Sequence, residues 1–323
     1  MIFTIGARSR AARTERVYMR GVPATVRRCG DVPERETGAG GRYARTASDA
    51  VRNTGNDMRL SGADGERMKI FGDYHMHTKA SDGRATVGQL AERAAELGLK
   101  EIAVADHGCG SLLFHQTEKK FAAQQEEIAR INAEGGVRVY SGIEASITGE
   151  DGTLDVPDGM IAECGVLTVG FHRFLQWRYV RREPRFLLVN GWGSERARGQ
   201  DGLKEYNTRA WLNALANYPV DVLCHLGHRA QVDAARVCRA AAELGVYVEL
   251  NEKHIDAIEE CAEEVIASGV KFILGSDAHS AAKVGLFAKV EEFLTRHSIP
   301  EERVCGIGAE PVFRPKKGFK RTK

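Results

Sequence analysis

Residues 70–83 read IFGDYHMHTKASDG. The apolar start of this stretch predicts a buried strand, Ile70–His77, that ends in two histidines. Side chains two residues apart on a strand point the same way, so His75 and His77 can face one centre. Asp82 follows in the next loop. The stretch therefore predicts a strand with ligand-type side chains gathered at its C-terminal end.

The rest of the chain, up to residue 275, alternates short apolar runs with amphipathic stretches. This alternation predicts parallel β/α units, and about seven strands favour a closed barrel over an open sheet. The later predicted strands are Glu101–Asp106, Val137–Ser141, Val166–Phe171, Val220–Cys224, Val246–Leu250 and Phe272–Gly275. The predicted helices are Val87–Leu97, Glu118–Ala133, Leu203–Asn217, Ala234–Leu244 and Ile255–Ala267.

Nearly every predicted strand is followed by a possible metal ligand. A parallel barrel brings all its strand C-termini to one rim, where active sites are built. Imidazole and carboxylate ligands together suit zinc, manganese or iron, and this many exceed the capacity of one tetrahedral ion. We therefore predict two to three divalent ions (Mn, Fe or Zn). The candidate ligands are His75, His77, Asp82, His107, Glu144, His172, His225, Asp277 and His279.

The remaining histidines and one aspartate fit this pattern less well. His228 lies one turn from His225, and Asp106 precedes His107; both are predicted to support ligands rather than to bind metal. Asp106 would orient His107 or hold a loop. His115, His254 and His297 lie off the strand ends and are predicted to be surface or supporting residues.

The motifs together resemble one known family. In chain order they are His75-Met76-His77-Thr78 with Ser81-Asp82-Gly83, Ala105-Asp106-His107, Gly142-Ile143-Glu144, Gly170-Phe171-His172, Cys224-His225 and Gly275-Ser276-Asp277-Ala278-His279. Over about residues 69–308 this order resembles the PHP (polymerase and histidinol phosphatase) family. It is most similar to stand-alone PHP phosphatases and to the PHP domain of bacterial family X DNA polymerases. The resemblance implies an α/β fold, a distorted (β/α)7 barrel of TIM-like type.

The resemblance also implies a trinuclear site and a reaction. One metal would be held by His75, His77, Glu144 and Asp277, a second by Glu144, His172 and His225, and a third by Asp82, His107 and His279. Metal-activated water would then hydrolyse a phosphate ester, either of a phosphorylated metabolite such as histidinol phosphate or of a nucleotide. Arg229 stands where similar proteins carry an arginine, and its planar fork would hold phosphate oxygens.

Two departures from the family pattern leave the substrate open. Glu252-Lys253-His254 follows the predicted strand where polymerase-linked PHP domains carry an arginine. Leu226-Gly227-His228 lacks the proline of those domains.

Two alternative functions follow from other features. An amidohydrolase-type metal hydrolase also opens with His-x-His on a barrel. A nucleic-acid end-processing exonuclease or phosphatase would use the segment 1–67 and the loop 173–202, in which arginines and aromatic residues interleave. The alternative for the loop 173–202 is an insertion that covers the barrel, in which Trp177 and Trp192 are buried.

The chain is predicted to hold one globular domain, residues 68–310. Residues 1–67 lack a core-forming pattern and are predicted to be a disordered basic extension, or the product of a mis-assigned start before Met68. Residues 311–323 are predicted to be a basic C-terminal tail.

The composition of the chain limits which classes of binding partner are expected. The net charge of +2 does not by itself argue for nucleic acid or membrane, and no apolar run approaches the ~18 residues of a membrane span. The seven cysteines are scattered without a C-x-x-C pair, which predicts reduced thiols and a cytoplasmic protein. The expected partner is a small-molecule phosphate ester.

Overall fold

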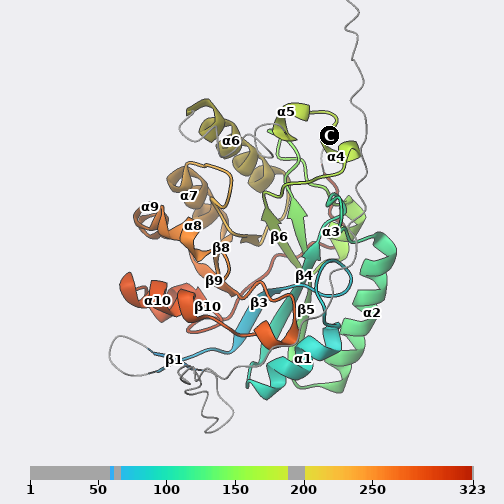
Figure 1. Ribbon diagram of the computed structural model, residues 1–323, viewed down its shortest axis with the longest axis vertical. Coiled ribbons are helices and arrows are strands. Elements are labelled where there is room, and N and C mark those ends of the chain that lie inside the picture. The colour runs from blue at the N-terminus through green and yellow to red at the C-terminus, as the bar shows by residue number, and fades with distance from the viewer. Residues whose placement is uncertain (1–58, 62–66, 188–200, 322–323) are drawn as a thin grey trace, which may run out of the picture. The chain divides into compact units, whose positions relative to one another are not determined.

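The computed structural model describes residues 59–61, 67–187 and 201–321 (Figure 1). The chain divides into two compact units, Met1–Arg52 and Asn53–Lys323, and every described residue belongs to the second unit. Most of the predicted extension, and Trp192 in the long loop, lie outside the described residues. The domain boundaries at 67/68 and 310/311 therefore stay predictions.

The second unit is built on one sheet of eight parallel strands. They are β3 (Gly72–Met76), β4 (Glu101–His107), β5 (Arg138–Ser146), β6 (Val166–Gly170), β7 (Val222–Leu223), β8 (Tyr247–Asn251), β9 (Phe272–Gly275) and β10 (Val304–Cys305). Their order in the sheet is β10-β9-β8-β7-β6-β5-β4-β3. A separate antiparallel pair joins β1 (Arg59–Ser61) to β2 (Arg67–Lys69).

The two ends of this sheet meet and close a barrel. Met76, at the end of β3, forms a parallel bridge with Ala278, just past β9. The backbone N–H of His77 donates to the carbonyl of Ala278 at 2.9 Å, and that of Phe71 donates to the carbonyl of Gly306 at 2.8 Å. The seven strands β3–β9 form the wall, with the short β10 beside β9. The predicted distorted (β/α)7 barrel is confirmed.

Helices connect the strands and surround them in Figure 1. They are α1 (Val87–Glu96), α2 (Glu118–Glu134), α3 (Asp158–Glu163), α4 (Trp177–Val180), α5 (Pro184–Leu187), α6 (Asp201–Asn217), α7 (Ala234–Leu244), α8 (Ile255–Glu259), α9 (Ala262–Ala267) and α10 (Ala288–Arg296), with the 3₁₀ helices η2 (Ala281–Lys283) and η3 (Glu301–Arg303). Local sequence determines where several of these helices begin or end. Thr86 and Gln89 form a capping box at the start of α1, and Gly245 ends α7 in a left-handed conformation. No helix among the described residues is long and apolar enough to cross a bilayer.

Three sequence predictions differ from the structure. The strand β5 runs on to Ser146, so Glu144 lies inside the strand and not after it. The predicted strand Val220–Cys224 pairs only at Val222 and Leu223. The predicted helix Ile255–Ala267 is two helices, α8 and α9. The break escaped prediction because both pieces bury apolar residues with one continuous period.

The C-terminal segment 311–321 packs against the end of the barrel where its strands begin. Lys316 and Asp221 form a salt bridge of 2.5 Å, and each side chain is 1% exposed. Asp221 also accepts the backbone N–H groups of Leu167 and Arg314, both at 2.8 Å. Burial raises the pKa of Asp221, and Lys316 partly offsets that rise. Lys316 is therefore part of the packed unit, whereas Lys317 and Lys320 are exposed.

We expect Lys316→Met to lower the free energy of unfolding by about 3 kcal/mol, because it leaves a buried carboxylate without its cation. The loss should shrink as the pH falls toward about 4, where Asp221 becomes protonated in both the folded and unfolded states. Urea unfolding at several pH values measures both effects. Lys317→Met, at an exposed neighbour, is the matched control. Equal unfolding midpoints for the two variants would contradict this role of Lys316.

Candidate metal centre

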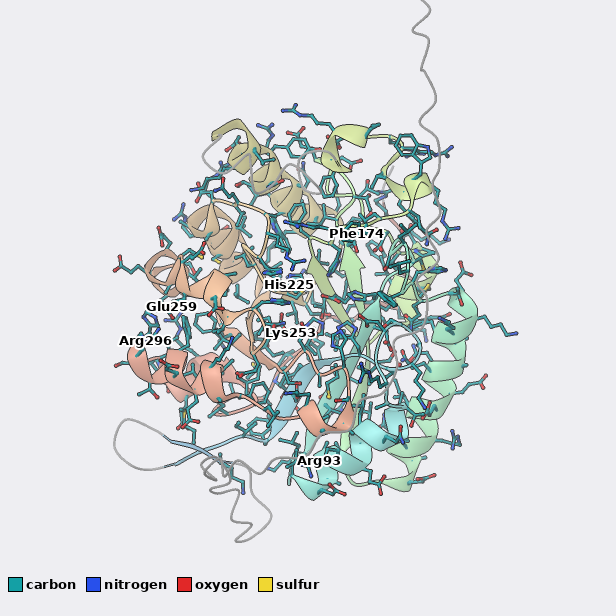
Figure 2. The ribbon with its side chains drawn as sticks, viewed as in Figure 1. Arg93, Phe174, His225, Lys253, Glu259 and Arg296 are labelled. Carbon is teal, nitrogen blue, oxygen red and sulfur yellow. The ribbon has the colours of Figure 1, made fainter. Side chains whose placement is uncertain are left out.

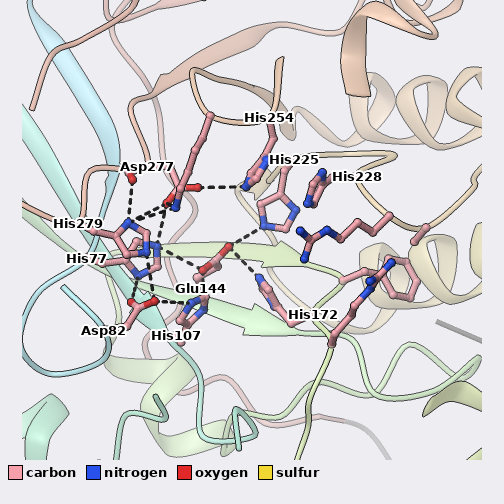
Figure 3. Close-up of a pocket in the computed structure, with 15 residues that line it drawn as sticks. His77, Asp82, His107, Glu144, His172, His225, His228, His254, Asp277 and His279 are labelled. Atoms are coloured by element: carbon pink, nitrogen blue, oxygen red, sulfur yellow. Dashed lines mark hydrogen bonds and ion pairs between the residues drawn. The ribbon is translucent and has the colours of Figure 1, made fainter. Parts of the chain in front are cut away.

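All nine predicted ligands meet at the rim where the strands end. Eight of them line a cavity of ≈ 320 Å³ (Figure 3). The ninth, His75, is buried, and its Nε2 lies 3.5 Å from Glu144 Oε1. The lining residues are His77, Asp82, His107, Glu144, Phe171, His172, Arg173, His225, His228, Arg229, Ala230, Lys253, His254, Asp277 and His279. In Figure 2, His225 and Lys253 lie near the centre of the barrel, whereas Arg93, Glu259 and Arg296 lie at its periphery.

Glu144 is the centre of this cluster. Its Oε1 lies 2.8 Å from Nε2 of His225 and 3.0 Å from Nε2 of His172. Its Oε2 lies 2.8 Å from Nδ1 of His107. His75 and His77 approach the two oxygens at 3.5 Å and 3.6 Å. One carboxylate from β5 is thus within reach of five imidazoles that come from four strand ends.

Two aspartates hold the opposite side of the pocket. Asp277 Oδ1 lies 3.4 Å from His77 Nε2 and 3.3 Å from His279 Nδ1. Asp82 Oδ2 lies 3.1 Å from His279 Nε2 and 3.6 Å from His107 Nε2. The residues on the first and last strands of the barrel therefore share one ligand cluster.

In the part of the chain that the structure describes, four overlapping groups have ligand atoms within 4.8 Å of one another. The groups are His75–His77–Asp277, His77–Asp82–His107, His107–Glu144–His172 and Glu144–Cys224–His225. Cys224 is not among the ligands predicted from sequence. Burial and the nearby Glu144 carboxylate raise the pKa of its thiol well above the ordinary value, which keeps it protonated in the metal-free protein.

The electrostatics of the metal-free cluster depend on Glu144. Burial alone would raise the pKa of Glu144, but His172, His107 and His75 hold it well below its usual range. Burial would lower the pKa of His107, yet Glu144 and Asp82 raise it to about 10. Burial lowers the pKa of His172 to about 4, and Glu144 offsets this only in part. Cations are therefore strongly favoured at this carboxylate.

His75 tests whether these residues fit a metal ion. Its Nδ1 lies 2.7 Å from Oε1 of Glu249, while its buried Nε2 has no hydrogen-bond partner. A histidine that gives one ring nitrogen to a carboxylate and leaves the other unpaired is the usual state of a metal-binding imidazole. The donor set of imidazoles and carboxylates also suits zinc, manganese or iron. The residues fit the predicted divalent ions.

Glu249 contacts the cluster but is not among the site residues predicted from sequence. It is 1% exposed in β8, and its Oε2 accepts the backbone N–H of His225 at 3.0 Å. One buried carboxylate thus positions the His75 ring and the chain at His225. The sequence did carry a sign of this role, because an acidic residue in the middle of a buried strand is costly unless it is paired with another polar group.

Asp106 holds a loop. It accepts the backbone N–H and hydroxyl of Thr78, at 2.8 and 2.6 Å, and the hydroxyl of Ser81 at 2.5 Å. Gln124 of α2 donates to it at 2.5 Å. These contacts fix the loop that carries Asp82. Of the two supporting roles predicted for Asp106, its contacts are those of the loop-holding one.

The turn after β8 brings two further residues to the pocket. The Asn251 side chain accepts the backbone N–H groups of Lys253 and His254, at 2.9 and 3.0 Å. Lys253 Nζ then lies 3.4 Å from Asp277 Oδ1, and the His254 ring stacks on His228 with ring centres 3.9 Å apart. The sequence analysis placed His254 off the strand-end pattern, yet it lines the pocket beside His228.

Backbone strain gathers at the same rim. Five described non-glycine residues have positive φ, and three of them, His225, Arg229 and Asp277, line the pocket. A fourth, Phe174, follows the pocket residue Arg173. Few residues other than glycine and asparagine adopt this conformation, and it is retained mostly where the surrounding structure enforces it for a function.

Comparison with known proteins shows which family the chain resembles. The family described as PHP domain matches residues 73–296. A "Probable phosphatase" of Acetivibrio thermocellus is 28% identical over 256 residues, which span 75% of this chain and 93% of that protein. A "Probable phosphatase" of Edwardsiella ictaluri is 30% identical over 250 residues, which span 74% of this chain and 91% of that protein.

The chain is also similar to a solved structure. The histidinol phosphate phosphatase of Lactococcus lactis, complexed with zinc, L-histidinol and phosphate, is 17% identical with a TM-score of 0.49, over 71% of this chain and 94% of that chain. Because the family match spans more than half of its length, the chain belongs to the PHP domain family of metal-dependent phosphoesterases, as its motifs predict.

Proposed function

We propose that the chain hydrolyses a phosphate monoester at a trinuclear centre held by the nine predicted ligands. The observation that carries the proposal is the convergence of six imidazoles and three carboxylates on one rim, with the cations Arg229 and Lys253 in the pocket wall. Divalent ions bound there would neutralise the phosphate charge and lower the pKa of bound water.

The residues of the chain would divide the remaining work. Arg229 and Lys253 would hold phosphate oxygens that do not react. Glu249 would keep Nε2 of His75 free for metal, and Asp106 would hold Asp82 in place. Phe171 and Ala230 would exclude water from part of the pocket wall. The cavity of ≈ 320 Å³ suits a phosphate with a small leaving group, of which histidinol phosphate and a nucleotide are examples.

A phosphatase screen with added Mn²⁺ tests this function. The phosphate-ester substrates are p-nitrophenyl phosphate, phosphorylated metabolites and mononucleotides. A p-nitroanilide amide is included to test the amidohydrolase alternative. We expect phosphate release that EDTA abolishes and Mn²⁺ restores. Hydrolysis of the amide without any phosphate ester would refute the proposal and favour the amidohydrolase alternative.

We expect purified protein to carry more than one equivalent of Mn, Fe or Zn per chain. The reason is that nine ligand candidates in four overlapping groups exceed what one ion can use. Elemental analysis of protein dialysed against metal-free buffer gives the count. Uptake of at most one ion, even from excess Mn²⁺, would exclude the trinuclear centre.

We expect Arg229→Ala to raise KM for phosphate esters roughly tenfold while kcat falls less. A guanidinium on a non-reacting oxygen binds ground and transition states alike, and lysine cannot restore its bidentate contact. Steady-state kinetics of the alanine and lysine variants measure this, with Arg130→Ala on the exposed face of α2 as control. An unchanged KM would remove Arg229 from the phosphate site.

A further inference from the structure

Two loops beside the pocket expose a patch of large apolar side chains. Leu112, Leu113 and Phe114 are 53, 71 and 48% exposed, and Phe174 and Trp177 are 58 and 62% exposed. We call these five residues the rim patch. They are five of the eight large exposed apolar residues found among the described residues. Apolar groups gathered in this way mark interaction sites, whereas scattered ones do not.

The rim patch is held together by backbone contacts between its two loops. Ser111 and Leu175 form an antiparallel bridge, and the N–H of Leu112 donates to the carbonyl of Phe174 at 2.8 Å. Gln176 ties the loops again, through its N–H to the carbonyl of Gly110 at 2.7 Å. Phe174 is fixed at a φ of 59° with its ring largely in solvent. The patch is therefore a built surface with a strained aromatic residue in it.

The rim patch adjoins the proposed active site. Its two loops directly follow the proposed ligands His107 and His172. Arg173 lines the pocket, and Phe174 is the next residue. A substrate with its phosphate in the pocket would extend over the patch if it were larger than the cavity.

The surroundings of the rim patch are basic. Residues 173–187 contain five arginines and one acidic residue, and Arg178, Arg181 and Arg182 are exposed. The carboxylate of that acidic residue, Glu183, is occupied, because it accepts the hydroxyl of Tyr206 at 2.5 Å and the N–H of Glu150 at 2.7 Å. The surface therefore complements a polyanion.

The exposed aromatic residues of the rim patch indicate which kind of polyanion this surface would bind. The predicted alternative in which the tryptophans of this loop are buried is wrong for Trp177, which is 62% exposed. Exposed aromatic rings interleaved with arginines can stack bases and pair with phosphates, as single-stranded nucleic acids require. Leucines beside basic residues also occur on membrane-binding surfaces, so an anionic membrane is the alternative to be tested.

We propose that the rim patch, with Arg178, Arg181 and Arg182, binds a single-stranded oligonucleotide whose terminal phosphate enters the pocket. This rests on the proposed phosphatase function and names its substrate class. The bases stack on Phe114, Phe174 and Trp177. Water attacks the terminal phosphorus, the bond to the strand's oxygen breaks, and that oxygen takes a proton. The products are inorganic phosphate and a strand that ends in a hydroxyl.

Binding of a fluorescent oligodeoxythymidylate of about 12 nucleotides, followed by anisotropy against KCl, tests the proposal. We expect Trp177→Ala/Phe174→Asn to weaken binding roughly tenfold. Asparagine is chosen because it tolerates positive φ. We expect Arg178→Ser/Arg181→Ser/Arg182→Ser to lower the slope of log affinity against log salt by about 2. Leu244→Ala/Arg239→Ser, at exposed positions of α7, should match the parent chain.

Hydrolysis assays separate this proposal from the proposed function. For both rim variants, kcat/KM on terminally phosphorylated oligonucleotide should fall about tenfold further than on p-nitrophenyl phosphate. Binding without any phosphate release by the parent chain would sink the phosphatase function and leave the nucleic-acid surface standing. Undetectable oligonucleotide binding, or equal binding by parent and rim variants, overturns the inference. So does binding of phosphatidylserine vesicles, in place of oligonucleotide, that the rim variants lose.

Discussion

Asp277→Asn should reduce kcat/KM for phosphate esters by about 10³-fold or more, because it replaces a proposed anionic metal ligand with a neutral group. The bound metal it would help to hold stabilises the transition-state charge by several kcal/mol. Asp277 lies among His77, His279 and Lys253. Burial alone would raise its pKa, but His77, His75 and Lys253 hold it far below the usual range. Asparagine keeps the volume and tolerates the φ of 52° at this position. The fold should therefore survive the change.

Steady-state kinetics with Mn²⁺ and urea unfolding measure the two expectations for Asp277→Asn. Asp256→Asn, at an exposed carboxylate of α8, is the matched control and should keep normal turnover. His75→Ala should lose activity to a similar degree. Because both residues are assigned to one metal, the double variant should be little worse than either single one. Near-normal turnover of either single variant would contradict the assignment.

Glu249→Gln is the second large effect we expect, with activity at limiting Mn²⁺ roughly 10–100-fold lower. The carboxylate of Glu249 does not line the pocket, but it contacts His75 Nδ1 and accepts the N–H of His225. An amide offers one acceptor where these groups and Asn251 use two. The His75 ring should lose its fixed orientation, and metal affinity should fall.

Titration of activity with Mn²⁺ distinguishes this positioning role from a general loss of structure. Excess Mn²⁺ should restore much of the activity of Glu249→Gln, whereas it should restore little to Asp277→Asn. Glu243→Gln, on the exposed face of α7, serves as control. A loss of activity that Mn²⁺ cannot reverse, with a matching drop in unfolding midpoint, would make Glu249 a stability residue only.

The convergence of the nine candidate ligands could be predicted from sequence, because a parallel barrel brings the C-terminal ends of distant strands to one rim. His75, Glu144 and Asp277 are far apart in the chain, yet each lies at or near the C-terminal end of a parallel strand. The rule that such ends share a rim brings them together without knowledge of any distance. The barrel itself followed from the alternation of strands and helices for the same reason.

The contacts of residues outside this rule could not be predicted. Glu249 faces the cluster from inside a strand, and its partners are known only once β8 lies beside the other strands. Lys253 and His254 reach the pocket because Asn251 accepts two N–H groups and turns the chain. The exposure of Trp177 depends on a pairing between two loops. Each of these depends on a contact in space, and no period in the sequence reports it.

The closure of the barrel has a consequence for how the protein is made. The N–H of Ser276 bonds to the carboxylate of Asp73, and the two residues are 203 positions apart in the chain. Contacts of such long range are slow to form, because a large loop must close before they contribute. A ribosome synthesises Asp277 and His279 after the other seven ligands. The nascent chain therefore exposes an incomplete set of histidines and carboxylates, and ions captured at that stage would have to exchange as the last strand joins the first.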